Sequence, residues 1–506
     1  MADQLKPLTI VAPGFFGLNT QDSSVTLPKE YALRADNAVI DQFGRIAARR
    51  GWDNVNTSSG FNSTEPVVIH QVVKEDGSTE ILSIGDNKIY SGTTTLTLKY
   101  TGSTWTAQNW KVATFNGLTY FFQRAHAPIV YDHTSGAYSL MTAYAGYTGT
   151  VPQANEVLAA YGRLWVADTT TNKTLVSWSD SLIGYKWTAG TSGSVDIESV
   201  FTNGTDSVVA LAAFNGRLIV FCKKSIVIYS GADSNPTSNL ALEEVIDGVG
   251  CISRDSIQDI GTDILFLSDT GVRSLGRVIQ EKSAPIFDVS RNVRDDLIGD
   301  VIANNDNDNI RSVFYEKDGF YLLSLPTRGV SYCFDTKQRL QDFSLKTTIW
   351  TLSPKALCST NDRKLYLSRT GYIAEYTGTS DNGETFRFAY YTAHVDGGSP
   401  AILKILKKLV LLIIGGQGTR VTFRWGTDYG TNYATSQTLL PSFTRSEYNI
   451  AQYSINEYNS GLLINSLRKP ISGTGRVFQI GIEADIGSDI FSIQQLDAFV
   501  KTGRVI

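Results

Sequence analysis

Apolar residues along this chain come in short runs that are separated by turns. Residues 209–214 are almost all apolar, an Asn-Gly pair follows, and residues 217–221 form the next apolar run. A second turn at 222–224 leads into the apolar run 225–229. An Asn-Gly pair between two such runs is the strongest local signal for a β-hairpin, and runs this short are typical of strands. The pattern predicts three consecutive strands of one antiparallel sheet.

The same strand–turn–strand unit recurs through the middle of the chain. The first apolar residues after the successive turns are Ile89, Leu118, Leu164, Leu218, Ile264, Phe320 and Leu365. Their average spacing is about 46 residues, which matches the ~40–50-residue period of a β-propeller blade. The intervals range from 29 to 56 residues, so we expect six or seven blades with an atypical first one. A β-sandwich or a set of stacked meanders is the alternative.

The two ends of the chain do not follow this repeat. We expect an all-β protein with a β-rich N-terminal arm or platform over residues 1–65, a central β-propeller over 66–392, and an antiparallel, sandwich-like domain over 393–506. The last part holds longer runs that alternate apolar and polar residues, as a half-exposed antiparallel sheet does. Strands of the N-terminal arm are candidates to complete it.

Two segments have helical character. Residues 28–40 could form one helix with Pro28 near its first turn. Residues 289–301 lie in a long gap of the repeat, and Val293, Leu297 and Val301 recur there at helical spacing.

Composition and charge exclude several classes of protein. The hydrophobic fraction is 42% and the charged fraction 19%, which is too apolar for a disordered chain. A net charge of −4 lacks the clustered basic excess of a general nucleic-acid binder. The N-terminus has no signal-peptide pattern, and the longest apolar run, 409–414, is far short of the ~20 residues that cross a bilayer. We therefore expect a soluble protein without the usual export signal.

No catalytic, cofactor or metal site is predicted, because the relevant residue types lack the spacing that such sites need. The four cysteines are far apart in sequence and are expected to be free, buried thiols in a reducing compartment: Cys222, Cys251, Cys333 and Cys358. His126 and His133 flank a short segment that ends in Asp132, without a metal-binding motif. Ordinary loop histidines are the favoured interpretation.

Residues 304–309 resemble a calcium-binding loop at first sight. Counted from Asp306, Arg311 and Lys317 stand at the positions where an EF-hand needs glycine and glutamate. A polar turn is the favoured interpretation, and an irregular calcium site is the alternative.

Charged clusters complete the candidate chemistry. Neighbouring carboxylates occur at Glu243 and Glu244 and at Asp295 and Asp296, but neighbours in a strand point to opposite faces and make poor glycosidase pairs. The basic residues form two clusters, Lys404, Lys407 and Lys408, and Arg45, Arg49 and Arg50. The first suggests a solvated strand edge, with a contact with DNA or an acidic neighbour as the alternative. The second has the same two interpretations, and a salt bridge between subunits is a further one.

An ordered set of short motifs resembles one protein family. The motifs are Gly17-Leu18-Asn19, Leu27-Pro28-Lys29-Glu30-Tyr31-Ala32, Ala35-Asp36-Asn37-Ala38, Gly44-Arg45, Arg49-Arg50-Gly51-Trp52, Pro128-Ile129-Val130-Tyr131-Asp132, Gly162-Arg163-Leu164-Trp165-Val166-Ala167 and Val176-Ser177-Trp178-Ser179-Asp180. They resemble the nozzle proteins of short-tailed phages, also called tail tubular B or packaged-DNA stabilisation proteins. The chain is much shorter than the larger members of that class.

The resemblance implies a structural virion protein and not an enzyme. It implies a homo-oligomeric ring, usually a hexamer, at the distal end of the tail, assembled in the host bacterial cytoplasm. Such a ring retains packaged DNA, lets it pass without specific binding, meets adaptor and portal-side rings, carries tail fibres or spikes, and can contact the host envelope.

Two other functions fit a propeller. One is a carbohydrate-active or carbohydrate-binding propeller, a depolymerase or lectin, which needs a pocket on the axis with two carboxylates about 5–10 Å apart. The other is a monomeric scaffold that binds proteins on one face.

Overall fold

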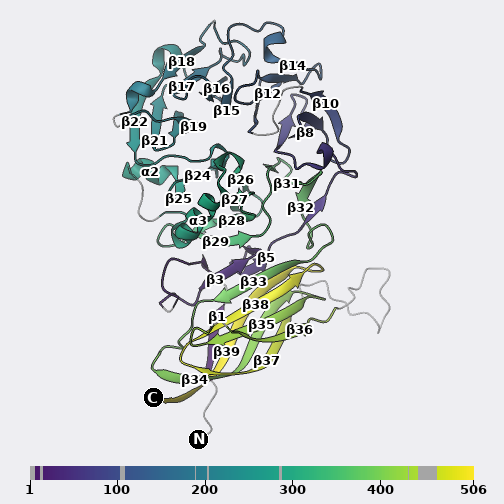
Figure 1. Ribbon diagram of the computed structural model, residues 1–506, viewed down its shortest axis with the longest axis vertical. Helices are drawn as coiled ribbons and strands as arrows, with labels where there is room; N and C mark the ends of the chain where they lie inside the picture. Colours follow the sequence, from purple (N-terminus) through teal and green to yellow (C-terminus); the bar gives the residue numbers. More distant parts are fainter. Residues whose placement is uncertain are drawn as a thin grey trace.

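The computed structural model describes residues 6–11, 15–24, 26–102, 109–188, 190–201, 204–283, 288–430, 432–442 and 464–505. They form a ring of β-sheets at one end of the molecule and a β-sandwich at the other, where both termini lie (Figure 1). The predicted all-β class with a central propeller is confirmed.

In the described part of the chain, the ring has seven blades. The first four contain four consecutive antiparallel strands each: β7 (Val68–Val73), β8 (Thr79–Gly85), β9 (Lys88–Ser91) and β10 (Thr97–Thr101); β11 (Lys111–Phe115), β12 (Leu118–Phe122), β13 (Ile129–Asp132) and β14 (Tyr138–Leu140); β15 (Ala154–Ala160), β16 (Arg163–Thr169), β17 (Leu175–Trp178) and β18 (Gly193–Asp196); β19 (Val208–Phe214), β20 (Arg217–Cys222), β21 (Ser225–Ser230) and β22 (Ala241–Asp247). A short helix, α1 (Pro236–Asn239), precedes β22.

Of the last three blades, the fifth and the seventh depart from this plan and the sixth follows it. Their strands are β23 (Gln258–Asp259), β24 (Ile264–Ser268) and β25 (Gly271–Ser274) in blade five; β26 (Arg311–Tyr315), β27 (Phe320–Leu325), β28 (Val330–Arg339) and β29 (Leu345–Trp350) in blade six; and β30 (Leu357–Ser359), β31 (Leu365–Arg369), β32 (Tyr372–Tyr376) and β6 (Trp52–Asn54) in blade seven. Helix α2 (Leu275–Glu281) follows β25. Strand β6 comes from the N-terminal arm and closes the ring.

Local turn chemistry explains why the hairpins could be predicted. Both residues of the pairs Asn116-Gly117 and Asn215-Gly216 have positive φ, at 48° and 74° and at 49° and 76°, as the tight turns of two-residue hairpins require. One anchor of the repeat is misassigned, because Ile89 lies in the third strand of its blade and the other anchors lie in the second. Blade one is therefore regular, and the atypical blades are the fifth, with three strands, and the seventh, which takes β6 from the N-terminal arm.

Each pair of neighbouring blades buries a shared apolar core. Leu82 of blade one packs in one core with Phe121 of blade two, and the other pairs repeat this arrangement around the ring. Between the last and first blades, Ile373 packs in one core with Ile69. A blade that is apolar on both faces is stable only when both are covered, so closure by β6 completes the burial.

The sandwich has two sheets that pack face to face. One contains β37 (Ile464–Gly475), β34 (Ile402–Gly415), β39 (Phe491–Val505), β5 (Ile46–Ala48) and β4 (Ala38–Ile40), with β1 (Lys6–Val11) beside β39; the other contains β3 (Tyr31–Asp36), β33 (Phe386–Thr392), β38 (Phe478–Ile486), β35 (Arg420–Thr427) and β36 (Ala434–Leu439), with β2 (Gly17–Leu18) beside β3. Leu409, Leu411, Phe423, Ile482 and Leu496 are buried between them.

The second sheet continues into the propeller. Strand β29 of blade six pairs in parallel with β3 at Ile349 and Asp36, so one ten-stranded sheet runs from the ring into the sandwich. Strand β33 lies within the range 66–392 predicted for the propeller but pairs with β38 of the sandwich. Strand β6 lies within 1–65 but belongs to blade seven.

One of the two predicted helices is wrong. Residues 28–40 contain β3 and β4, because Ala32, Ala35 and Ala38 lie buried against the sandwich core instead of on one helix face. The other is confirmed: α3 (Arg294–Asn304) buries Leu297 and Val301, and Val293 is buried directly before it.

Candidate functional site

The joint between ring and sandwich is built by residues of the N-terminal motifs. Asn37 lies between β3 and β4 with φ 51°. Its amide nitrogen donates to the carbonyl oxygen of Arg387 at 2.8 Å, and its side-chain oxygen accepts from the backbone nitrogen of Thr351 and from Nε of Arg49, both at 3.0 Å. One side chain thereby ties together the end of blade six, the strand β33 and the segment before β6.

Arg49 holds the same joint by an ion pair. Its guanidinium donates to both carboxylate oxygens of Asp381, at 2.8 and 2.7 Å, and lies 4.0 Å from the ring centre of Phe386. The Arg49 side chain is 1% exposed. A two-point contact of this kind fixes orientation as well as charge.

Arg45 and Arg50 are also paired within the chain. Arg45 contacts Asp41 at 2.6 Å and Gln494 at 3.1 Å, and the half-exposed Arg50 lies 3.4 Å from Asp318. Arg45 and Arg49 are buried and their charges are compensated within the chain, so neither requires the predicted salt bridge to another subunit.

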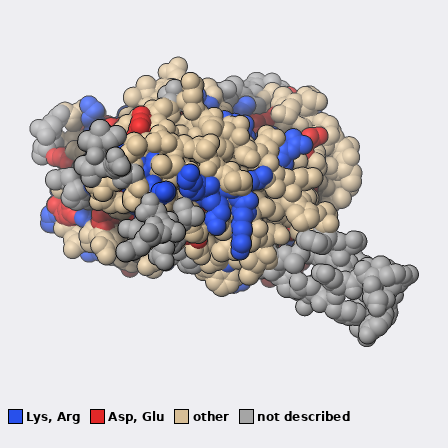
Figure 2. Space-filling model, turned by 90° about the horizontal axis from the view of Figure 1, so that it is seen from below, with Lys and Arg blue, Asp and Glu red and all other residues tan. Residues whose placement is uncertain are grey.

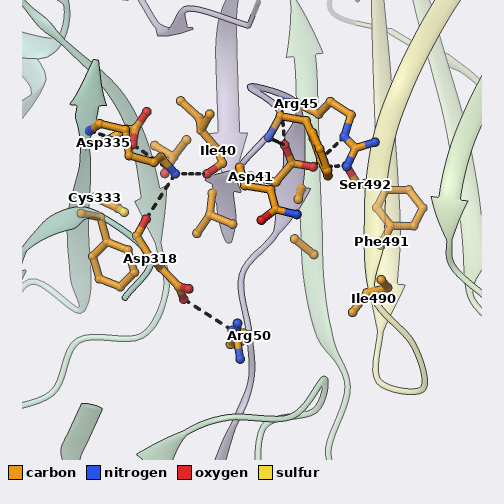
Figure 3. A pocket seen from close by; sticks show the side chains of 18 of the residues that line it. Ile40, Asp41, Arg45, Arg50, Asp318, Cys333, Asp335, Ile490, Phe491 and Ser492 are labelled. Atoms are coloured by element: carbon orange, nitrogen blue, oxygen red, sulfur yellow. Dashed lines mark hydrogen bonds and ion pairs between the residues drawn. The ribbon is translucent and has the colours of Figure 1, made fainter. Parts of the chain in front are cut away.

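A pocket of about 620 Å³ opens at this joint (Figure 3). Its lining comes from β4, β5, blade six, β32 and the start of β39, and Phe320, Tyr376 and Phe491 supply its buried apolar part. Lys337 contacts Asp335 at 3.3 Å and donates to the carbonyl oxygen of Ile40 at 2.7 Å. The pocket therefore combines an apolar floor with fixed charges.

A network of polar side chains lies where the inner strands of the propeller meet. Arg254 donates to the side-chain oxygen of Asn155 at 3.1 Å and to the carbonyl oxygen of Trp110 at 3.2 Å. Asp255 contacts Arg254 at 2.7 Å, Lys111 at 3.0 Å and Arg311 at 3.3 Å. These residues belong to, or immediately precede, the inner strands of blades two, three, five and six, so the network closes this part of the axis.

Burial changes the proton affinity of both acids in this network. Glu156 lies 3.8 Å from Arg254 and 3.9 Å from Lys111, and burial raises its pKa to about 7 although both cations act in the opposite direction. Burial alone would also raise the pKa of Asp255, but the charges of Arg254, Lys111 and Arg311 hold it far below its usual range.

In the described part of the chain, His126, Asp132 and His133 do not gather into a metal-type cluster, in line with the favoured interpretation as ordinary histidines. His126 and His133 lie beyond opposite ends of β13, and Asp132 accepts hydrogen bonds from the backbone nitrogens of Thr134 and Ser135. His133 instead ends a chain of hydrogen bonds in which His70, Thr114, Thr119 and His133 are linked at 3.0, 3.1 and 2.8 Å. The sequence gives no signal for this chain, because it depends on the contact between blades one and two.

The other candidates serve local structure. In 304–309, Asn304 donates to Asn309 at 2.9 Å and Asp306 accepts from the backbone nitrogen of Asp308 at 3.1 Å. Glu243 pairs with Arg217 at 2.6 Å and Glu244 with Lys282 at 2.8 Å, whereas Asp295 and Asp296 lie in the first turn of α3. Within the described ranges, no three or more His, Cys, Asp or Glu side chains gather to hold a metal ion. The four cysteines are free thiols.

Lys and Arg side chains gather on the face of the molecule seen from below in Figure 2. Lys404 is buried and donates to three carbonyl oxygens, at 2.6, 3.0 and 3.0 Å. The strand register places Lys408, Arg468 and Lys501 on the outer face of the first sandwich sheet, together with Asp497, and Lys407 is exposed at a bulge beside them. We call Lys407, Lys408, Arg468 and Lys501 the basic face.

Comparisons with known proteins find similarity in fold. No protein-family model matches the chain, and no curated protein matches it. The extracellular domain of BT4673 from B. thetaiotaomicron is similar with TM-score 0.42 and 11% identity over 66% of this chain and 41% of that one. BamB from Moraxella catarrhalis gives TM-score 0.36 and 10% identity over 74% and 98%. The Pan2 WD40 domain of Neurospora crassa gives 0.36 and 7% over 66% and 98%.

Across the residues that the structure describes, no helix has the length and apolar character needed to cross a membrane.

Proposed function

We propose that this chain is a structural protein of the tail of a short-tailed phage, of the nozzle type, and that it works without a catalytic site. The observation that carries the proposal is where the N-terminal motif residues lie. Asn37, Arg49 and Gly51 all belong to the joint of ring and sandwich, and Trp52 begins the strand that closes the ring. These motifs hold the propeller ring and the sandwich in a fixed relative position. Such rigidity is what a structural component of an assembly needs.

The polar network at the propeller axis limits where DNA can pass. Arg254 and Asp255 bridge inner strands of blades that are not neighbours in the ring, and duplex DNA has no path through such a network. We expect DNA to pass between copies of the chain, arranged as a homo-oligomeric ring that is most simply a hexamer. A passage wall with only a few cations holds DNA weakly enough to let it slide, because each added cation contact strengthens binding to phosphate.

The expected partners follow from this arrangement. Ring contacts to adaptor or portal-side proteins above and to fibres or spikes around it would use exposed loops held by strands. The chain would assemble in the host cytoplasm and remain in the virion, where host envelope contact occurs at infection.

A carbohydrate-active propeller remains the alternative class, but the axis does not favour it. A glycosidase needs two accessible carboxylates about 5–10 Å apart. Glu156 and Asp255 are the acids of the axial network, and both contact Arg254 and Lys111, so neither is free to meet a sugar.

Electron microscopy tests the proposal. Purified virions, and the chain mixed with portal and adaptor rings, are imaged and averaged. A ring of this chain at the distal tip of the tail, with the passage between copies, is the expected result. A stable monomer that is absent from the tail would contradict the proposal.

A further inference from the structure

The pocket at the joint contains more positive than negative charge. Five cations and three carboxylates line it. Each carboxylate has a basic partner: Asp41 contacts Arg45 at 2.6 Å, Asp318 contacts Arg50 at 3.4 Å, and Asp335 contacts Lys337 at 3.3 Å. Two lysines, Lys317 and Lys346, are left over.

These two lysines differ in their surroundings. Lys317 is exposed at the rim, in the turn between β26 and β27. Lys346 is 6% exposed, and its side-chain ammonium makes no hydrogen bond or ion pair with any residue of the described ranges. Its cross-strand neighbour is Asp335, whose carboxylate forms its ion pair with Lys337. A buried ammonium is costly without a partner that supplies negative charge.

We propose that the joint pocket binds a carboxylate attached to an apolar group, with the carboxylate paired to Lys346 and the apolar group lying on Phe320, Tyr376 and Phe491. The volume of about 620 Å³ lies within the ~300–1,000 Å³ of ordinary ligand pockets. A medium-chain fatty acid and a peptide C-terminus with an apolar last residue share this chemistry.

The proton affinities of the two facing residues agree with this assignment. Burial lowers the pKa of Lys346 and raises that of Asp335, so neither charge is fully compensated by the protein alone. A bound carboxylate would compensate Lys346 and would leave the Lys337–Asp335 pair in place.

Calorimetry on the purified chain tests the proposal with three pairs of probes: octanoate against octanol, octyl phosphate against octanol, and a tetrapeptide ending in leucine as free acid against its amide. We expect octanoate to bind at least tenfold more tightly than octanol. The peptide pair then identifies the source, because a free-acid preference larger than that of octanoate indicates a chain terminus. Octyl phosphate binding as tightly as octanoate would contradict carboxylate selectivity. Equal binding of acid and alcohol, or no binding, would overturn the proposal.

Variants locate the contact. Lys346→Met should abolish the preference for the acid while keeping octanol binding, and Lys346→Arg should retain most of it. Asp335→Asn should strengthen octanoate binding, because it removes a like charge. Lys223→Met, at an exposed turn, is the matched control and should behave like the wild type. If a variant fails to fold, the comparison of octanoate with octanol on the wild-type chain still tests the proposal. None of these measurements requires a phage tail to assemble, so failure of the proposed function would not affect them.

Discussion

His70 is a residue whose burial makes the stability of the fold depend on pH. Burial, together with the charges of Lys111 and His133, lowers its pKa to about 4, while in the unfolded chain it titrates near 6.5. Between these values His70 binds more protons in the unfolded state than in the folded state, so its own contribution to stability increases with pH across this window and is lost as pH falls toward 4. The loss should be on the order of 2–3 kcal/mol. Urea unfolding between pH 4 and 7 measures it.

His70→Gln separates this effect from other titrations. Glu156, whose pKa burial raises to about 7, contributes in the opposite direction over the same window, so each variant is compared with the wild-type profile. His70→Gln should remove the component of stability that increases with pH between 4 and 6.5, whereas His126→Gln, in a half-buried turn outside the hydrogen-bonded chain, should leave the profile unchanged. Identical pH profiles for His70→Gln and the wild type would show that His70 is not the responsible group.

Arg49 and Arg50 form a matched pair for testing the joint. Arg49→Lys keeps the charge but loses the two-point contact with Asp381 and the stacking on Phe386, so we expect a loss of about 1–3 kcal/mol. Arg50→Lys removes a half-exposed contact and should cost less than about 0.5 kcal/mol. Denaturant unfolding of both variants gives the comparison, and equal losses would contradict the role of Arg49 in the joint.

At the scale of elements, Gly51 controls entry into the closing strand β6. A Cβ atom at this position would lie 1.8 Å from the carbonyl oxygen of Ser380, so Gly51→Ala requires the backbone to move. We expect a destabilisation of at least about 2 kcal/mol, detected as a lower thermal midpoint and as earlier proteolysis near β6. Gly299→Ala, in α3 with no atom near the new methyl group, should be neutral or stabilise by up to about 1 kcal/mol. Equal behaviour of the two variants would contradict this account.

The elements also show how far the sequence can be interpreted. Asn116-Gly117 and Asn215-Gly216 predict their hairpins because a two-residue turn is specified by its own residues. Residues 28–40 were predicted as a helix but form strands. Alanines spaced by three fit one face of a helix, and they fit equally well on strands that bury small residues against the sandwich core. The joint pocket was beyond prediction, since Ile40, Lys346 and Phe491 meet only after β29 pairs with β3 and β39 with β5.

For the whole molecule, the proposed passage of DNA between copies predicts weak, salt-sensitive binding through the basic face. Each phosphate contact contributes about −0.9 to the slope of log K against log salt, so four cations give a slope of at most about −4. We expect Lys407→Glu combined with Lys408→Glu to reduce the slope by about two. Fluorescence anisotropy of a labelled duplex with the assembled ring, from low to physiological salt, measures it.

The control for this prediction lies in the propeller ring, outside the sandwich. Lys223 and Lys224 occupy an exposed turn of blade four, in the ring and not in the sandwich, and their double substitution by Glu changes the net charge by the same amount. If the basic face meets DNA, only the first pair changes the slope. If both pairs change it equally, the effect comes from net charge, and the passage is lined by some other face. An unchanged slope in both would place the DNA away from the sandwich and the blade-four turn alike.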